Sequence, residues 1–280
     1  MFLEDEFGDI IKKARYGLGK TIDGVGEKVG ISSTLLQSFE SYEEYPNKEL
    51  AYKLGMELGL EPESLWESVR ESWFPQSPPL VNGIIHAGVC IKVLTFDYAY
   101  SNCYLIADTN TRDTVIVDPG GPYNVILKAL EEEEWRPVGI MATHGHKDHI
   151  ASLELIATGC KVPVIGNPVE LDFQSLHGIS DERIIRLGTL EIEVWQMPGH
   201  TPGHLGFLIS DVALVGDTLF AGSLGRSYEG PKYYRILLES AERLLGLPPN
   251  TILLPGHGPI TSVREETEHN PFFIDRGDAY

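Results

Sequence analysis

The sequence has few cysteines, no long apolar run and no basic leader, and each of these absences narrows what the chain can be. Three cysteines among 280 residues are too few for a disulfide-rich secreted fold and suit a reducing cytoplasm. No apolar stretch approaches the roughly 20 residues that span a bilayer, so we expect no membrane partner. The chain starts MFLEDE, without the basic and apolar regions of a signal peptide. We therefore expect a cytoplasmic protein.

Positive charge is also scarce. The chain has 22 Lys and Arg against 41 Asp and Glu, a formal net charge of −19. Such a balance argues against nucleic acid as the main partner. An anionic substrate would need a local basic patch, for which Arg226 and Lys232 are candidates. The hydrophobic content of 42% over 280 residues is enough to fill one large core and a small second domain.

A run of seven residues, THGHKDH, follows the apolar stretch 138–142 and contains three imidazoles and a carboxylate. Open α/β sheets keep their chemistry at the ends of buried strands. His144 and His146 are alternate residues, so in an extended segment they point the same way and can hold one ion. Asp148 and His149 follow after a bend and can reach a second ion. Imidazole with carboxylate suits zinc, iron or manganese, so the run predicts a paired-metal site.

Three further candidate ligands lie in similar settings. His200 lies in the turn-like run PGHTPGH, and His257 lies in PGHG. Asp217 closes another apolar run. Glycine and proline frame loops, and catalytic residues concentrate on loops positioned by rigid elements. Repeated strand-then-ligand units favour a metal site over isolated structural histidines.

The motifs HxHxDH, PGHT, GDTLF and PGHG, in that order, make residues 81–280 resemble the metallo-β-lactamase fold superfamily. The resemblance implies an α+β fold, an αββα sandwich with the metals at one edge of the sheets. It also implies two divalent metal ions as cofactors, with zinc the first choice and iron or manganese as alternatives. In the family's pattern the first metal is held by His144, His146 and His200, the second by Asp148, His149 and His257, and Asp217 bridges both.

The stretches 216–220, 225–230 and 247–251 narrow the resemblance to hydroxyacylglutathione hydrolases, the glyoxalase II group. This resemblance implies that Arg226 and Tyr228 contact the glutathione moiety. The longer members of the group continue into a helical C-terminal domain with further basic contacts. This chain stops at residue 280, which leaves the identity of the thiol open.

The implied reaction is hydrolysis of a small-molecule thioester such as S-lactoylglutathione. Metal ions lower the pKa of bound water from about 15.7 toward about 7, so a metal-bridging hydroxide can attack the carbonyl. The metals also stabilise the oxyanion, and thiolate is a good leaving group. Asp148 and Asp217 are the catalytic carboxylates of this scheme. Cys90, Cys103 and Cys160 have no paired spacing, and we expect ordinary core cysteines.

Two other functions are compatible with parts of the sequence. Persulfide dioxygenases share the fold but bind one iron through two histidines and an aspartate, here His144, His200 and Asp217. That group usually continues with Thr-Asp-Phe after its arginine, whereas this chain has Ser-Tyr-Glu-Gly, which favours the hydrolase. The second alternative is a metal-sensing DNA-binding or scaffold protein. A complete set of seven ligands favours an enzyme over that alternative.

Residues 1–75 have a different pattern, and we predict a separate helical domain there, a proline-rich linker over 76–80 and a catalytic domain over 81–280. Short amphipathic stretches joined by glycine-containing turns resemble a Cro/CI-type helix-turn-helix domain. This region holds eight Lys and Arg against fifteen Asp and Glu, and its expected recognition helix, 32–40, has no positive charge. DNA affinity depends largely on Lys and Arg, so we expect an interaction role, such as homodimer formation, instead of DNA binding.

Two residues near the motifs have roles that the sequence leaves open. Asp118 follows another apolar run and is equally compatible with a turn cap and with a hydrogen-bond partner of a ligand histidine. His204 is predicted to support the site without binding metal. His86, His177 and His269 have no polar companions and are left out of the site.

Overall fold

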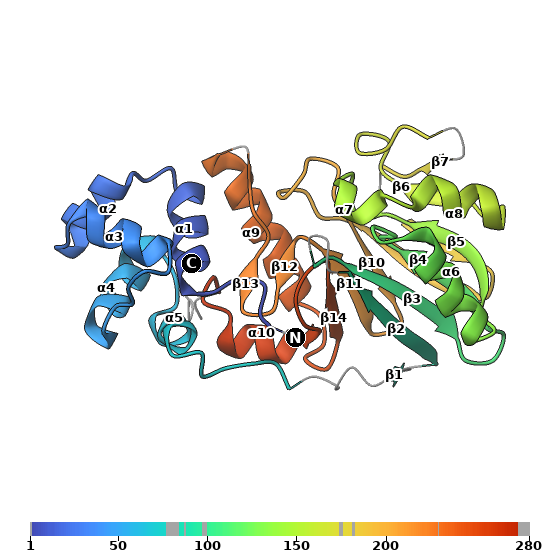
Figure 1. The fold of residues 1–280 in the computed structure, drawn as a ribbon, viewed down its shortest axis with the longest axis horizontal. Coiled ribbons are helices and arrows are strands. Elements are labelled where there is room, and N and C mark those ends of the chain that lie inside the picture. Colours follow the sequence, from blue (N-terminus) through green and yellow to red (C-terminus); the bar gives the residue numbers. More distant parts are fainter. Residues whose placement is uncertain are drawn as a thin grey trace.

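The computed structural model describes residues 2–76, 84–86, 88–96, 100–173, 176–180, 183–228 and 230–273. Two β-sheets pack face to face with helices on both outer sides (Figure 1), which confirms the predicted αββα sandwich. Most of the predicted linker 76–80 lies outside the described residues. No helix in the described part of the chain is both long and apolar enough to cross a membrane.

The first sheet has seven described strands, which pair in chain order. They are β1 (Ile84–His86), β2 (Val89–Thr95), β3 (Asn102–Asp108), β4 (Asp113–Val117), β5 (Arg136–Met141), β6 (Val164–Gly166) and β7 (Leu176–Gly178). The outer face of this sheet is covered by α6 (Tyr123–Glu132) and α8 (Leu153–Cys160). The short helix α7 (Lys147–Ile150) lies between β5 and α8 in the chain.

The second sheet has the order β15-β14-β11-β10-β9-β8. Its strands are β8 (Arg183–Leu187), β9 (Leu190–Gln196), β10 (Leu205–Ile209), β11 (Val212–Gly216), β14 (Ile252–Pro255) and β15 (Thr261–Ser262). The hairpin β12 (Leu219–Phe220) and β13 (Ser223–Leu224) follows β11. Helices α9 (Pro231–Leu245) and α10 (Val263–His269) complete the outer layer.

Alternation along the strands explains why the sheets stack. In β11, Val212 and Leu214 belong to the core between the two sheets, while Ala213 and Val215 belong to the core under the outer helices. Successive side chains of a strand point to opposite faces, so an unbroken apolar run can supply two cores at once. Strands β11 and β14, which lead to Asp217 and His257, are therefore buried on both faces.

The N-terminal region is helical, as predicted, whereas its helix-turn-helix class stays a prediction. It contains α1 (Phe7–Gly17), α2 (Ile22–Val29), α3 (Ser33–Glu40), α4 (Lys48–Leu58) and α5 (Pro62–Val69). The N-terminal ends of these helices are capped by polar side chains. The side chains of Thr21, Ser32 and Asn47 accept from backbone N–H groups of α2, α3 and α4. Pro62 occupies the first turn of α5, where its missing N–H costs nothing.

These helices share their hydrophobic core with the outer helices of the sandwich. Phe7, Ile10 and Ala14 of α1 belong to the same buried cluster as Tyr234 and Leu237 of α9. Figure 1 shows α1, in blue, beside α9 and α10, in orange and red. At Gly17 of α1, a Cβ atom would lie 2.3 Å from the ring of Tyr234, so only glycine allows this approach. The helical region is thus packed onto the sandwich directly.

A buried ion pair connects α1 with α3. The Nε and Nη2 atoms of Arg15 each lie 2.6 Å from an oxygen of Glu40, and both side chains are about 5% exposed. Arg15 Nη1 also donates to the carbonyl of Lys20, at 3.1 Å. Two parallel N–H···O bonds of this kind fix the angle between the helices as well as their distance.

We expect Glu40→Gln to lower the free energy of unfolding by about 3–5 kcal/mol, because it leaves the Arg15 guanidinium buried without a counter-charge. Chemical denaturation measures the change. Glu132→Gln is the matched control, because Glu132 pairs with Lys128 at 3.5 Å on an exposed helix surface. That control is expected to unfold with the wild-type midpoint. Equal midpoints for all three proteins would show that the buried pair does not hold α1 in place.

Candidate metal centre

All seven predicted metal-binding residues lie at one edge of the sandwich. Each follows the end of a strand: β5 precedes His144, β9 precedes His200, β11 precedes Asp217 and β14 precedes His257. Strands β4 and β5 are parallel, as are β11 and β14, so their carboxyl ends meet on the same side. The topology therefore brings together residues more than 100 positions apart in the sequence.

The first cluster contains His144, His146, His200 and Asp217. Nδ1 of His146 lies 3.0 Å from Nε2 of His144 and 3.1 Å from Nε2 of His200. Oδ2 of Asp217 lies 3.4 Å from Nε2 of His200. One donor atom from each of the four residues falls within 4.8 Å of the others, which is close enough to share one ion.

The second cluster contains Asp148, His149 and His257. Nε2 of His257 lies 3.3 Å from Nε2 of His149 and 3.3 Å from Oδ2 of Asp148. Asp217 reaches this cluster as well, since its Oδ1 lies 3.5 Å from Nε2 of His149. Its Oδ2 lies 3.6 Å from Nε2 of His257 as well, so the Asp217 carboxylate lies between the two clusters.

Hydrogen bonds on the outer ring nitrogens fix which nitrogens face inward. Nδ1 of His200 donates to the carbonyl of Arg226 at 2.8 Å, and Nδ1 of His149 donates to Asp118 at 3.0 Å. When these rings are neutral, their Nε2 atoms therefore turn lone pairs toward the clusters. Nitrogen lone pairs about 3 Å apart repel one another unless a cation lies between them. Oδ1 of Asp217 is also buried without a hydrogen-bond partner among the described residues. This donor set fits divalent metal ions.

Asp118 organises two of the histidines through one carboxylate. It accepts from the backbone N–H and the hydroxyl of Thr143, both at 2.7 Å, and from Nδ1 of His149. Because Thr143 gives its hydroxyl proton to Asp118, its oxygen is left to accept from Nδ1 of His144, at 3.0 Å. Of the two roles left open for Asp118, the structure confirms the hydrogen-bond partner of a ligand histidine. The residue is buried and has a φ of 50°, a left-handed conformation that costs of order 1 kcal/mol.

His204 supports the centre from behind, as predicted. It is buried, its Nε2 accepts from the backbone N–H of Asp217 at 3.1 Å, and its ring stacks on that of His144. Burial lowers the pKa of His204 to about 3, so the ring is neutral and can accept this bond. Gly216 has a φ of 48°, and a Cβ atom there would lie 2.7 Å from His204, so the turn before Asp217 needs glycine.

The carboxylates and histidines of the two clusters shift one another's pKa values. Burial acts to raise the pKa of Asp217, but His149 and His200 hold this pKa well below its ordinary value. Burial acts to lower the pKa of His149, but Asp217 and Asp118 raise it to about 9. Burial lowers the pKa of His144 far below its usual range. Asp217 is therefore ionised at neutral pH, and metal binding has to displace a proton from His149.

A cavity of about 540 Å³ opens over the two clusters. Arg226 and Tyr228, the predicted substrate contacts, both line it, with the Arg226 guanidinium 5.3 Å from the centre of the Tyr228 ring. The Tyr228 side chain is 62% exposed, which makes it available to a ligand. Lys232, the other basic candidate, lies in the first turn of α9 and does not line this cavity. The substrate role of Arg226 and Tyr228 stays a prediction.

The N-terminal region also lines this cavity. The side chains involved are Glu4, Asp5, Asp9 and Lys13. Oε2 of Glu4 lies 4.0 Å from Nδ1 of His257, and burial raises the pKa of Glu4 to about 7. Lys13 donates to the carbonyl of Leu224 at 2.7 Å and pairs with Asp5. No motif marks these four residues, because only the packing of α1 against α9 brings them to the site.

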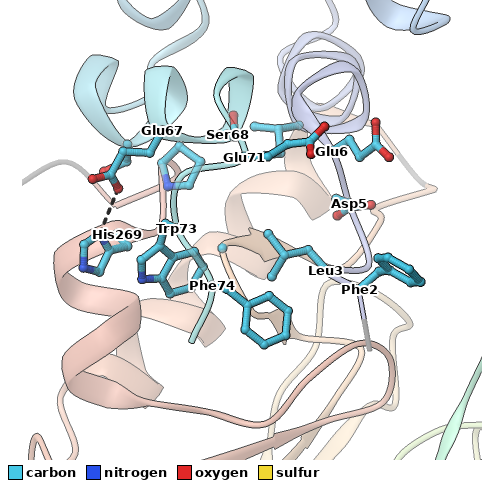
Figure 2. A pocket seen from close by; sticks show the side chains of 14 residues that line it. Phe2, Leu3, Asp5, Glu6, Glu67, Ser68, Glu71, Trp73, Phe74 and His269 are labelled. Carbon is cyan, nitrogen blue, oxygen red and sulfur yellow. Dashed lines mark hydrogen bonds and ion pairs between the residues drawn. The ribbon is translucent and has the colours of Figure 1, made fainter. Parts of the chain in front are cut away.

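A second cavity, of about 360 Å³, separates the N-terminal segment from α5 and α10 (Figure 2). His269 lines it, stacked on Trp73 with ring centres 5.1 Å apart and with Nδ1 2.8 Å from Glu67. This histidine therefore has a role at the junction of the helical region and the sandwich, away from the clusters. His177 lies in the edge strand β7, and the side chain of His86 lies outside the described residues.

Comparison with known proteins gives a consistent result. Residues 97–257 match a family model described as the Metallo-beta-lactamase superfamily. The chain is 29% identical over 206 residues to the hydroxyacylglutathione hydrolase GloC of Haemophilus influenzae, covering 65% of this chain and 97% of GloC. It is 32% identical over 192 residues to the probable metallo-hydrolase YqgX of Bacillus subtilis, covering 60% of this chain and 90% of YqgX.

A solved structure with a similar fold is TTHA1623 in a di-iron-bound form. The TM-score is 0.51 at 26% identity, and the match covers 72% of this chain and all of that protein. The segment matched by the family model starts at residue 97, so α1 to α5 lie outside it.

We expect Asp118→Asn to weaken metal binding about 10- to 100-fold, because the amide cannot accept from both Thr143 and His149 as the carboxylate does. Competition with a chromophoric chelator measures the affinity. Asp23→Asn, an exposed change on α2, serves as the control and is expected to bind metal like the wild type. Unchanged affinity in Asp118→Asn would mean that this carboxylate does not orient the ligands.

Proposed function

The chain belongs to the metallo-beta-lactamase superfamily, and we propose that it is a metal-dependent hydrolase that cleaves a small-molecule thioester such as S-lactoylglutathione. The observation that carries this proposal is the pair of histidine and aspartate clusters that share Asp217. The similarity to GloC, a hydroxyacylglutathione hydrolase, supports the choice of a thioester as the substrate.

In this proposal the clusters hold two divalent metal ions, with zinc the first choice. The first cluster supplies three imidazole nitrogens and the second supplies two with the carboxylate of Asp148, while Asp217 serves both. Bound metal ions supply Lewis acidity at the substrate carbonyl. The similarity to a di-iron protein keeps iron as an alternative.

The protein's own side chains set up the reaction around that chemistry. Asp217 and Asp148 both have a pKa below the ordinary value, so they are ionised and accept hydrogen bonds from a nucleophilic water. Hydrogen bonding from His257 lowers the pKa of Asp148, and the histidines of both clusters lower that of Asp217. Water is the nucleophile of choice, because burial raises the pKa of Cys90, Cys103 and Cys160 and keeps their thiols protonated.

The substrate is proposed to lie across the cavity with its carbonyl at the clusters and its thiol portion toward Arg226 and Tyr228. The Tyr228 ring lies 5.8 Å from the His200 ring, so a group packed on this tyrosine is adjacent to the first cluster. Arg226 supplies a planar donor that suits carboxylate groups. Thiolate leaves without a strong general acid, so the site needs no further proton donor.

The alternative is a persulfide dioxygenase with one iron held by His144, His200 and Asp217. That arrangement would give no role to the second cluster. Yet His149 of this cluster is buried and hydrogen-bonded to Asp118, and His257 contacts Asp148. A second set of oriented ligands favours the hydrolase with two metals.

We expect His257→Ala to lose one of two bound metal equivalents and to lower kcat/KM for S-lactoylglutathione at least about 100-fold, because a ligand is removed from the second cluster. Elemental analysis and the loss of thioester absorbance measure the two effects. His177→Ala, on an edge strand, is the matched control and is expected to keep both metal equivalents and the wild-type kcat/KM.

The same experiment separates the two functions. A dioxygenase with a single iron would keep its metal and its activity in His257→Ala, because it does not use this ligand. Oxygen consumption with glutathione persulfide by a protein with one iron would contradict the hydrolase. Turnover of S-lactoylglutathione without oxygen uptake is the expected result.

A further inference from the structure

Helix α1 has two stripes of side chains that serve different purposes. The apolar stripe is buried in the core shared with α9 and consists of Phe7, Ile10, Ile11 and Ala14. The polar stripe has the same spacing, two residues further on, and consists of Asp9, Lys12, Lys13 and Tyr16. Residues at i, i+3, i+4 and i+7 share one face of a helix, so packing of the first stripe fixes where the second one points.

The polar stripe of α1 faces a small cavity of about 90 Å³ beside residues 225–227. We call this space the α1 pocket. Asp9, Lys13 and Arg226 line both the α1 pocket and the larger cavity over the clusters, so the two spaces adjoin. A substrate with its reacting group at the clusters can therefore place another group in the α1 pocket.

The α1 pocket is cationic in a protein whose net charge is −19. Lys12, Lys13 and Arg226 line it against one carboxylate, that of Asp9. Lys12 is half-buried and forms no ion pair with the described residues. Lys13 uses two of its three N–H donors, on Asp5 and on the Leu224 carbonyl, which leaves one for a ligand.

Ser227 adds a neutral donor to the same space. Its hydroxyl oxygen is buried and has no hydrogen-bond partner among the described residues. A buried hydroxyl without a partner costs free energy, and a bound acceptor would remove that cost. The α1 pocket is large enough to admit one carboxylate and its nearest carbons.

We propose that the α1 pocket binds a carboxylate of the substrate, so that Lys12, Lys13 and Arg226 select thioesters whose thiol portion is anionic. The inference rests on the proposed thioester hydrolysis and adds the part of the substrate that α1 recognises. Because α1 lies outside the segment matched by the family model, the contribution of Lys12 and Lys13 to this selectivity comes from the chain's own N-terminal helices.

The test compares S-lactoylglutathione, which has two carboxylates, with the uncharged thioester S-lactoyl-N-acetylcysteamine. We expect Lys12→Glu to raise KM for the glutathione thioester about tenfold, because the local positive charge is reversed. The ratio of kcat/KM between the charged and the uncharged substrate falls accordingly. Lys12→Gln is expected to give a smaller change in the same direction, and it guards against misfolding of the reversed-charge variant.

Lys28→Glu is the matched control, because it makes the same change in net charge on an exposed position of α2. We expect this control to keep the wild-type ratio of kcat/KM between the charged and the uncharged substrate. Equal effects of Lys12→Glu and Lys28→Glu on this ratio would show that only the overall charge of the protein matters, and would overturn the proposed carboxylate site in the α1 pocket. An unchanged KM in Lys12→Glu would overturn it as well, while leaving the proposed hydrolysis in place.

If the wild type hydrolyses neither thioester, the proposed function is wrong. The carboxylate site in the α1 pocket is then tested by ligand binding alone. Calorimetry of glutathione with the metal-loaded protein is then the measurement. About tenfold weaker binding to Lys12→Glu than to the wild type and Lys28→Glu supports a carboxylate site in the α1 pocket. Equal binding to all three, or no binding to the wild type, overturns it.

Discussion

The carboxylate of Asp118 is the interaction on which the centre depends. It lies directly after β4 and accepts hydrogen bonds from the first residues after β5 and from His149 of α7. One buried group therefore fixes the distance between two strand ends and the direction of two imidazole rings. Its left-handed backbone is tolerated because three donors hold it in place.

A second constraint comes from the core that α1 shares with α9. Helices α9 and α10 are covered in turn by the N-terminal helices, whose apolar side chains belong to the same buried cluster. The Arg15 and Glu40 pair then holds α1 against α3. Apolar packing of α1, whose residues lie more than 200 positions before His257 in the sequence, therefore sets the position of one wall of the cavity over the clusters.

The sequence predicts the sandwich and the convergence of the seven ligands because both depend on local patterns. Apolar runs that end in polar turns place His144, Asp217 and His257 at strand ends, and parallel pairing brings the ends of β11 and β14 together. His200 follows the alternating strand β9, which is antiparallel to its neighbours. Glu4 and Lys13 could not be predicted, because their place in the cavity depends on how α1 packs, and no short motif encodes the packing of a surface helix. Lys232 illustrates the opposite error: its charge suggested a substrate contact, but it lies in the first turn of α9, away from the cavity lining.

The two stripes of α1 have a consequence for how such a protein can change. The residues that anchor the helix and those that face the cavity alternate along the same two turns, so they can be exchanged independently. Substitutions of Asp9, Lys12 or Tyr16 leave the apolar stripe and all metal ligands untouched, whereas Lys13 also holds α1 to the carbonyl of Leu224. In the proposed function, α1 is therefore the part of the cavity wall through which substrate preference can change while the metal ligands stay the same.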